Sequence, residues 1–115
     1  MKAVLIDDNE ICLETESAII QNVDVIDELH SFQDSGELIS YISDNPIDVA
    51  FLDIIMDDSD GITLAMEIKR LQPSCKIIFI SSSRDFALEA FQVYASGYLL
   101  KPVTESEIVT VLSNI

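Results

Sequence analysis

Polar residues with chemically active side chains come directly after four apolar runs of the sequence. Three are carboxylic acids, one carries a hydroxyl and one carries an amine: Asp7, Asp8, Asp53, Ser81 and Lys101. If the runs are parallel strands, their carboxyl ends share one edge of a sheet, and these side chains then lie together at that edge. The pattern predicts one site built from four separate parts of the chain.

The predicted site contains three carboxylates and one amine, which is an excess of negative charge. Two like charges about 4 Å apart repel by about 4 kcal/mol at an effective dielectric constant of about 20, so the cluster needs a further cation. Ligands that are all oxygen and highly charged suit Mg²⁺ or Mn²⁺, which keep several waters and accept a phosphate as co-ligand. The sequence therefore predicts a divalent metal beside Asp7, Asp8 and Asp53.

Each of these features also has an ordinary structural explanation. Asp7 and Asp8 could begin a loop and cap the helix that follows, and the serines at 81–83 could form a polar loop. Lys101 and Pro102 could simply end a strand. Because suitable chemistry occurs at four strand ends together, the site interpretation is favoured over these separate explanations.

Apolar runs alternate with amphipathic segments along the whole chain. The runs predict five strands, at residues 3–6, 23–29, 49–52, 77–80 and 98–100. The other segments predict five helices, at residues 11–20, 36–42, 61–71, 85–94 and 106–112. Three runs are continuously apolar, which is typical of parallel strands covered on both faces. The pattern predicts an α/β fold, a (βα)5 chain wound around one parallel sheet with helices on both faces.

Capping residues support these helix boundaries. Asp34 or Ser35 can cap the second helix, and Asp60 can cap the third. Thr104 can cap the last helix, where Glu107 three residues on completes a capping box. The first helix has one apolar face, and its glutamates are expected to face solvent: Glu10, Glu14 and Glu16.

The composition fits one folded domain and excludes several functions. The 115 residues are 49% hydrophobic, which suits a normal buried core. Six Lys and Arg residues against 21 Asp and Glu residues give a net charge of −15, so direct contact with nucleic acid or an anionic membrane surface is not expected. No apolar run approaches the roughly 20 residues of a membrane-spanning helix. Acidic residues begin too early for a signal peptide, which predicts a cytoplasmic protein.

Three further features bear on the organisation of the chain. Cys12 and Cys75 are far apart in the sequence and lack metal-site spacing, so reduced, buried thiols are expected, with a disulfide as the alternative. His30, the single histidine, is expected after the second strand and away from the site. The last helix runs to the end of the chain at Ile115, which predicts that residues 1–115 are the N-terminal domain of a longer protein.

Four motifs of this sequence match a known family in order and spacing. They are VLIDDNE at 4–10, FLDIIM at 51–56 with Asp60-Gly61, IIFIS at 77–81 and GYLLKP at 97–102. With these motifs the chain resembles, over essentially all its length, the receiver domain of two-component response regulators. The resemblance implies a flavodoxin-like, doubly wound, five-stranded parallel sheet in the order 2-1-3-4-5. Residues 86–102 are similar to regulators with LytTR-type output domains, which implies an output that controls transcription.

The resemblance also implies a role for each site residue. Asp53 would accept a phosphoryl group from a phosphohistidine, on a sensor histidine kinase or a phosphotransfer protein. Ser81 would bond to the phosphoryl oxygen, Lys101 would pair with it, and Tyr98 would be an aromatic switch. The Mg²⁺ ligands would be three carboxylates and one backbone carbonyl, from Asp7, Asp8, Asp53 and Ile55.

A receiver domain is a signalling domain that catalyses its own phosphorylation and dephosphorylation, rather than an enzyme with a separate substrate. Besides the phosphoryl donor, the resemblance implies an output domain beyond residue 115. It also leaves open a homodimer, which would form through the face of the fourth helix, the fifth strand and the fifth helix.

The sequence departs from the family pattern near the acceptor residue. The family usually has Pro one residue after Met56, and here Asp57-Asp58-Ser59 makes the loop more acidic. Ser81 replaces the commoner Thr but keeps the hydroxyl. Ile55 and Ser83 occupy positions that in the family tune the lifetime of the acyl phosphate, and an aliphatic Ile55 side chain cannot orient an attacking water.

Three other functions are weighed against this interpretation. An EF-hand count begun at Met56 gives acidic residues and a glycine at suitable positions, but Met56 itself offers no oxygen ligand and an apolar strand precedes it. A phosphatase-like hydrolase would need a second Asp at position 55, where the chain has Ile. An interaction module that works without phosphorylation usually lacks the acceptor or an acidic-pair residue, and this chain has both.

Overall fold

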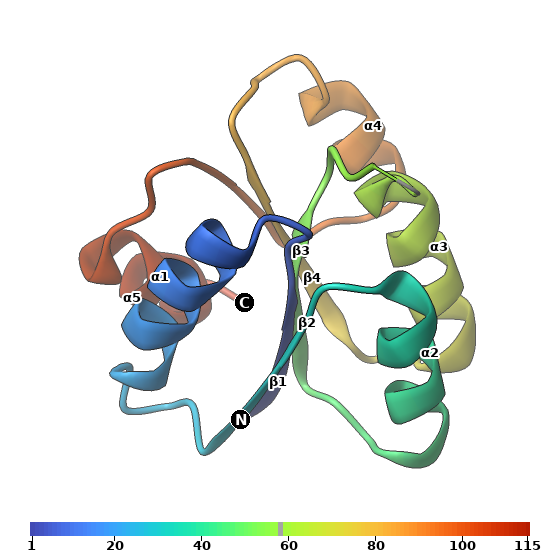
Figure 1. Ribbon diagram of the computed structural model, residues 1–115, viewed down its shortest axis with the longest axis horizontal. Helices are drawn as coiled ribbons and strands as arrows, with labels where there is room; N and C mark the ends of the chain where they lie inside the picture. Colours follow the sequence, from blue (N-terminus) through green and yellow to red (C-terminus); the bar gives the residue numbers. More distant parts are fainter. Residues whose placement is uncertain (58) are drawn as a thin grey trace.

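The computed structural model of the chain describes residues 1–57 and 59–115, which form one parallel sheet between two layers of helices (Figure 1). The strands are β1 (Lys2–Ile6), β2 (Glu28–Phe32), β3 (Val49–Asp53), β4 (Lys76–Ser81) and β5 (Gly97–Leu100). The helices are α1 (Glu10–Gln21), α2 (Ser35–Asp44), α3 (Gly61–Leu71), α4 (Ala87–Gln92) and α5 (Glu105–Ser113).

The strands pair in the order β2-β1-β3-β4-β5, and all pairs are parallel. This confirms the doubly wound, flavodoxin-like order 2-1-3-4-5. The order reverses between β1 and β3, and ligands of such sheets bind at the carboxyl ends of the strands beside that reversal. Ile6 pairs with Leu52 in the register, so Asp7 and Asp53 leave the sheet side by side.

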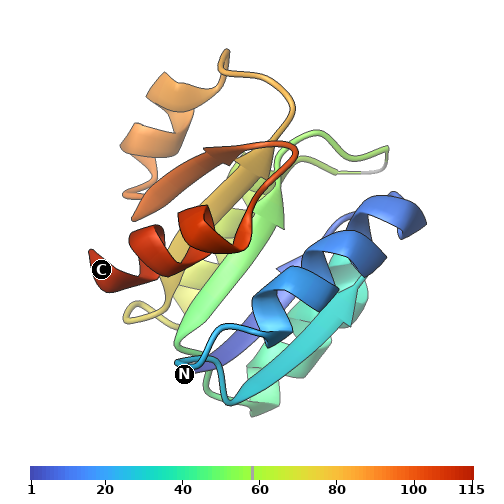
Figure 2. The same ribbon diagram turned by 90° about the vertical axis from the view of Figure 1, so that its left-hand side faces the viewer.

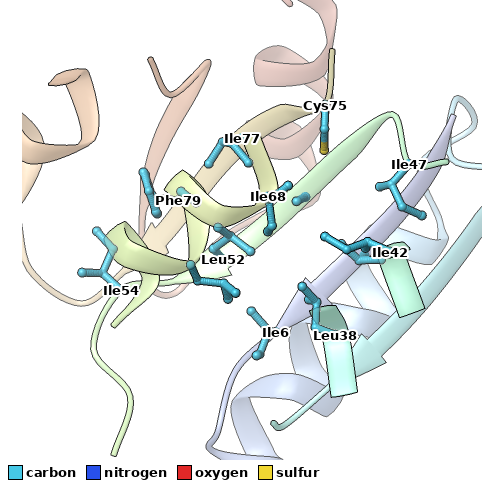
Figure 3. Packing of buried hydrophobic residues seen from close by; sticks show 14 of the residues in the cluster. Ile6, Leu38, Ile42, Ile47, Leu52, Ile54, Ile68, Cys75, Ile77 and Phe79 are labelled. Carbon is cyan, nitrogen blue, oxygen red and sulfur yellow. The ribbon is translucent and has the colours of Figure 1, made fainter. Parts of the chain in front are cut away.

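Alternate residues of the inner strands supply two separate hydrophobic cores. Val4 and Ile6 of β1 pack in the core under α2, α3 and α4, part of which Figure 3 shows. Ala3 and Leu5 pack in the opposite core, under α1 and α5, the two helices in front of the sheet in Figure 2. Fully burying one Leu, Ile or Phe side chain contributes roughly 1.5–3 kcal/mol. The inner strands are therefore a rigid platform for the residues that follow them.

Three helices, α2, α3 and α5, begin at the predicted capping residues. The Asp34 side chain accepts a hydrogen bond from the backbone N–H of Glu37, and the Asp60 side chain accepts one from Thr63. The predicted capping box at the start of α5 is present. Both cysteines are free thiols, with Cys75 buried and Cys12 half-buried. Among the described residues, no helix has the length and apolar character that crossing a membrane requires.

The predicted second strand is wrong in its position. The apolar residues at 23–27 form the connection after α1, where the side chain of Val23 fills the core, and the strand itself follows at Glu28–Phe32. Because β2 is an edge strand and is only partly buried, it lacks the continuous apolar run of the inner strands. His30 consequently lies within β2, not after it, and its ring is 4.6 Å from that of Tyr41 between centroids.

At Gly61 the main chain lies very close to the backbone of Asp53, at the end of β3. A Cβ atom there would overlap the backbone carbonyl of Asp53 and lie 2.9 Å from the Cα of Ile54. We expect Gly61→Ala to lower the free energy of unfolding by about 2 kcal/mol or more, because the backbone must shift. Gly36→Ala is the matched control near the start of α2, where a Cβ meets only the end of the Asp34 side chain at 3.1 Å. Urea denaturation that gives equal losses for both variants would contradict this explanation.

Candidate functional site

The structure brings the predicted acidic residues and the lysine together at the carboxyl edge of the sheet. One carboxylate oxygen from each of Asp7, Asp8 and Asp53 lies within 4.8 Å of the other two. The ammonium of Lys101, at the end of β5, is 2.7 Å from Asp7 Oδ2 and 3.6 Å from Asp53 Oδ2. Oxygen ligands at this spacing and charge fit a hard divalent cation such as Mg²⁺.

Backbone donors hold the two carboxylates of the β1–α1 loop in place. Asp7 Oδ1 accepts a hydrogen bond from the backbone N–H of Asn9 at 2.9 Å, while Asp8 Oδ2 accepts one from Asp57 at 2.7 Å. The α1 cap is Asn9, whose side chain accepts from the N–H of Cys12 at 3.0 Å. Helix capping therefore does not account for the acidic pair.

Burial strengthens the electrostatic interactions of the cluster. Asp7 is 0% exposed and Asp53 is 6% exposed. Burial and the charge of Asp7 raise the pKa of Asp53 to about 6, against the opposing effect of Lys101. Burial alone would lower the pKa of Lys101, but its bond to Asp7 and the charges of the other carboxylates raise it. Lys101 therefore stays charged, and it is the one ammonium that the described residues place among these carboxylates.

Glu16 belongs to this cluster, although the sequence predicts that it faces solvent. Its residue is only 5% exposed, and its Oε2 lies 3.9 Å from Lys101 Nζ. Burial and the charge of Asp7 raise the pKa of Glu16 to about 8. The prediction is wrong because Glu16 stands four residues before Ile20, on the face of α1 that packs on the sheet. That spacing is the sequence signal that could have located it.

Ser81 and Tyr98 lie on the β4 and β5 side of the site. Ser81 is fully buried, and its hydroxyl oxygen accepts a hydrogen bond from the backbone N–H of Ser83 at 3.1 Å. The Tyr98 ring packs against Phe79, with centroids 6.4 Å apart, and its hydroxyl donates to the carbonyl of Ser83. The backbone N–H of Lys101 donates to the Ser81 carbonyl at 2.9 Å. The predicted hydroxyl, aromatic and amine residues are thus connected through one loop.

The loop that follows β3, called the acceptor loop after its expected role, closes on itself. Ile55 pairs with Asp60 in an antiparallel bridge, and the N–H of Gly61 donates to the Ile54 carbonyl at 2.8 Å. The Ile55 side chain is exposed. Asp58, which the acidic-loop prediction includes, lies outside the described residues. Because β3 precedes this loop, the helix–loop–helix frame of an EF-hand is not present here.

Fold and site together define a doubly wound α/β domain with a buried acidic cluster and a lysine at the reversal of strand order. The family model for the response regulator receiver domain matches residues 3–113 of the chain. The chain belongs to this family, as the four sequence motifs predict.

Curated relatives and a solved structure agree with this family. Protein MrkE of Klebsiella pneumoniae is 30% identical over 115 residues, which are 100% of this chain and 43% of that protein. The sensory transduction protein LytR of Staphylococcus epidermidis is 33% identical over 108 residues, 94% of this chain and 43% of that protein. The crystal structure of the MrkE response regulatory domain superposes with a TM-score of 0.80 at 29% identity, covering 98% of this chain and 93% of that one. The chain thus spans less than half the length of the curated relatives it matches.

The raised pKa of Glu16 predicts a pH-dependent stability difference. The folded protein holds the Glu16 proton up to about pH 8, whereas the unfolded chain loses it near pH 4.5, so this group destabilises the fold as pH rises between those values. In the presence of chelator, we expect Glu16→Gln to be more stable than wild type by about 1–3 kcal/mol at pH 8, and equally stable at pH 4. Denaturant unfolding across this range measures the difference. Glu14→Gln, exposed on the same helix, is the control, and a similar pH trend there would contradict the assignment.

Proposed function

We propose that the domain accepts a phosphoryl group on Asp53 from a phosphohistidine of a sensor histidine kinase or phosphotransfer protein, in a Mg²⁺-dependent reaction. The observation that carries this proposal is the buried carboxylate of Asp53 between the Lys101 ammonium, 3.6 Å away, and the acidic pair. With a pKa of about 6, Asp53 is mostly ionised at neutral pH and can act as a nucleophile.

The transfer needs positioning and charge neutralisation more than it needs acid–base chemistry. An Asp53 oxygen forms the new P–O bond while the P–N bond of the phosphohistidine breaks, and the electron pair leaves with the imidazole. Mg²⁺, held by Asp7, Asp8 and Asp53 with the backbone carbonyl of Ile55, would offset charge on the phosphoryl oxygens. Lys101 exchanges its contact with Asp53 for one with the phosphoryl group. Water then hydrolyses the acyl phosphate at the same site, so the domain catalyses both of its own reactions.

The hydrogen bonds of Ser83 connect the neighbourhood of Asp53 to Tyr98, and through them a change at Asp53 can reach the surface. We infer that the Ser81 hydroxyl turns toward the phosphoryl oxygen and leaves the N–H of Ser83. Because the Ser83 carbonyl holds the Tyr98 hydroxyl, a shift of this loop moves Tyr98 and the face of α4, β5 and α5. The added phosphoryl charge is thereby converted into a change in the conformation of this face.

The α4 side of this face carries large apolar side chains in solvent, which support a partner contact there. Leu88, Phe91 and Tyr94 are all well exposed. We infer that the occupant is a second copy of the domain or an output domain that controls transcription. The relatives support the latter, because they include a transcriptional regulatory protein, YpdB of Escherichia coli, of which the chain matches 47%. With a net charge of −15, the domain itself would not contact DNA, and we infer that it works in the cytoplasm.

Phosphorylation of Asp53 is tested with a small acyl-phosphate donor and Mg²⁺. Intact mass spectrometry should show one added phosphoryl group on the wild type and none on Asp53→Asn or in excess chelator, because the acceptor or the charge neutralisation is then missing. Asp44→Asn, at an exposed carboxylate on α2, is the control and should react like wild type. Incorporation that persists in Asp53→Asn would refute the assignment of the acceptor.

The switch is tested by amide hydrogen exchange of the phosphorylated and unphosphorylated protein. Changes in protection should reach α4 and its flanking loops, because the Ser81–Ser83–Tyr98 bonds connect them to Asp53. Ser81→Ala should still be phosphorylated but should show these distant changes in weakened form. Changes confined to the loops of Asp53 and Lys101, in both proteins, would refute the switch and leave phosphorylation intact.

A further inference from the structure

One backbone hydrogen bond connects the acceptor loop to the β1–α1 loop. The N–H of Asp57 donates to Asp8 Oδ2 at 2.7 Å, across 49 positions of sequence. Donors to an ionised carboxylate make short hydrogen bonds that are stronger than neutral ones. The Asp57 side chain itself is exposed, and within the described part of the chain its carboxylate has no hydrogen-bond or ion-pair partner.

Both ends of this bond are held in place by other contacts. The hydroxyls of Ser59 and Ser35 are 2.6 Å apart, which ties the acceptor loop to the start of α2. The main-chain carbonyl of Asp8 accepts a hydrogen bond from Gln33 Nε2 at 3.3 Å. The Asp57 N–H therefore meets the Asp8 carboxylate from a loop that is already fixed on the other side, and the half-buried carboxylate has little freedom to rotate.

We propose that the backbone N–H of Asp57 is a positioning group for Asp8, and that it holds this carboxylate in the orientation that binds the metal. The inference rests on the proposed function, because it concerns the Mg²⁺ of that site. Carboxylates that bind metals are themselves oriented by hydrogen bonds, and loss of such a partner typically costs about 10–100-fold in metal affinity. The contribution comes from the main chain of residue 57, where the family usually has Pro and therefore no N–H, so it is a feature of this chain rather than of the family. It is also independent of the charge of the Asp57 side chain.

Two substitutions separate the N–H from the side-chain charge. Asp57→Asn removes the charge and keeps the N–H, whereas Asp57→Pro removes both. By isothermal titration calorimetry, we expect Asp57→Pro to bind Mg²⁺ about tenfold more weakly than Asp57→Asn. A role in stability alone would instead lower the melting temperature of Asp57→Pro in chelator and leave the two Mg²⁺ dissociation constants equal, which would overturn the inference.

Amide hydrogen exchange tests the bond directly and does not depend on the proline variant. In the metal-free wild type, the Asp57 amide should be protected, and this protection should be lost in Asp8→Ala. Exchange at an unprotected rate in the wild type would overturn the inference. If the wild type binds no Mg²⁺, the metal site of the proposed function fails and the inference fails with it. If the wild type binds Mg²⁺ and both Asp57 variants bind equally, only the inference fails.

Discussion

The 2.7 Å ion pair between Lys101 and Asp7 is the contact on which the site depends. It joins the end of β5, at one edge of the sheet, to the end of β1, on the far side of β3 and β4. Asp7 has no exposed surface, so its charge needs a partner inside the protein. With Asp8, Asp53 and Glu16 nearby, this single ammonium cannot balance the carboxylates. The same contact thus stabilises the apo site and leaves a deficit of positive charge.

The sheet determines where this deficit of positive charge occurs. β1 and β3 leave the sheet in register, with a hydrophobic core on each face, so Asp7 and Asp53 cannot move apart without disturbing both cores. The close approach of Gly61 to the Asp53 backbone fixes the start of the acceptor loop in the same way. On the other side of Asp53, hydrogen bonds through Ser81, Ser83 and Tyr98 hold the start of the β4–α4 loop, and Phe86 near its end packs against the core. In the proposed function, the sheet side would hold Asp53 in position as the nucleophile, and the hydrogen bonds of the loop side would be the ones that change.

Much of this arrangement could be predicted from the sequence, because continuously apolar runs mark buried parallel strands and the residue after each run must lie at the carboxyl edge. This logic located Asp7, Asp53 and Lys101. It failed for β2, where partial burial at the edge of the sheet permits a mixed composition. Glu16 was missed because a charged side chain was assumed to face solvent, although its helical spacing from Ile20 indicated burial. For the bond from Asp57 to Asp8, the sequence shows only that an N–H is available where the family usually has Pro, and the partner of that N–H comes from the structure.

The excess of carboxylates also explains why such a site can respond to its ligands. In the metal-free protein, burial and mutual repulsion raise the pKa values of Asp53 to about 6 and of Glu16 to about 8, so the folded state favours fewer negative charges than the residues would carry in water. A cation that binds only this folded cluster stabilises it by an amount that increases with the logarithm of the cation concentration, once this concentration exceeds the dissociation constant. In the proposed reaction, a phosphoryl group would bring negative charge back to the same place, and Lys101 would then divide its interactions among more anions. Its 3.6 Å contact with Asp53 is the longer of the two and would be the one exchanged, whereas the 2.7 Å pair with Asp7 would keep the ammonium in place.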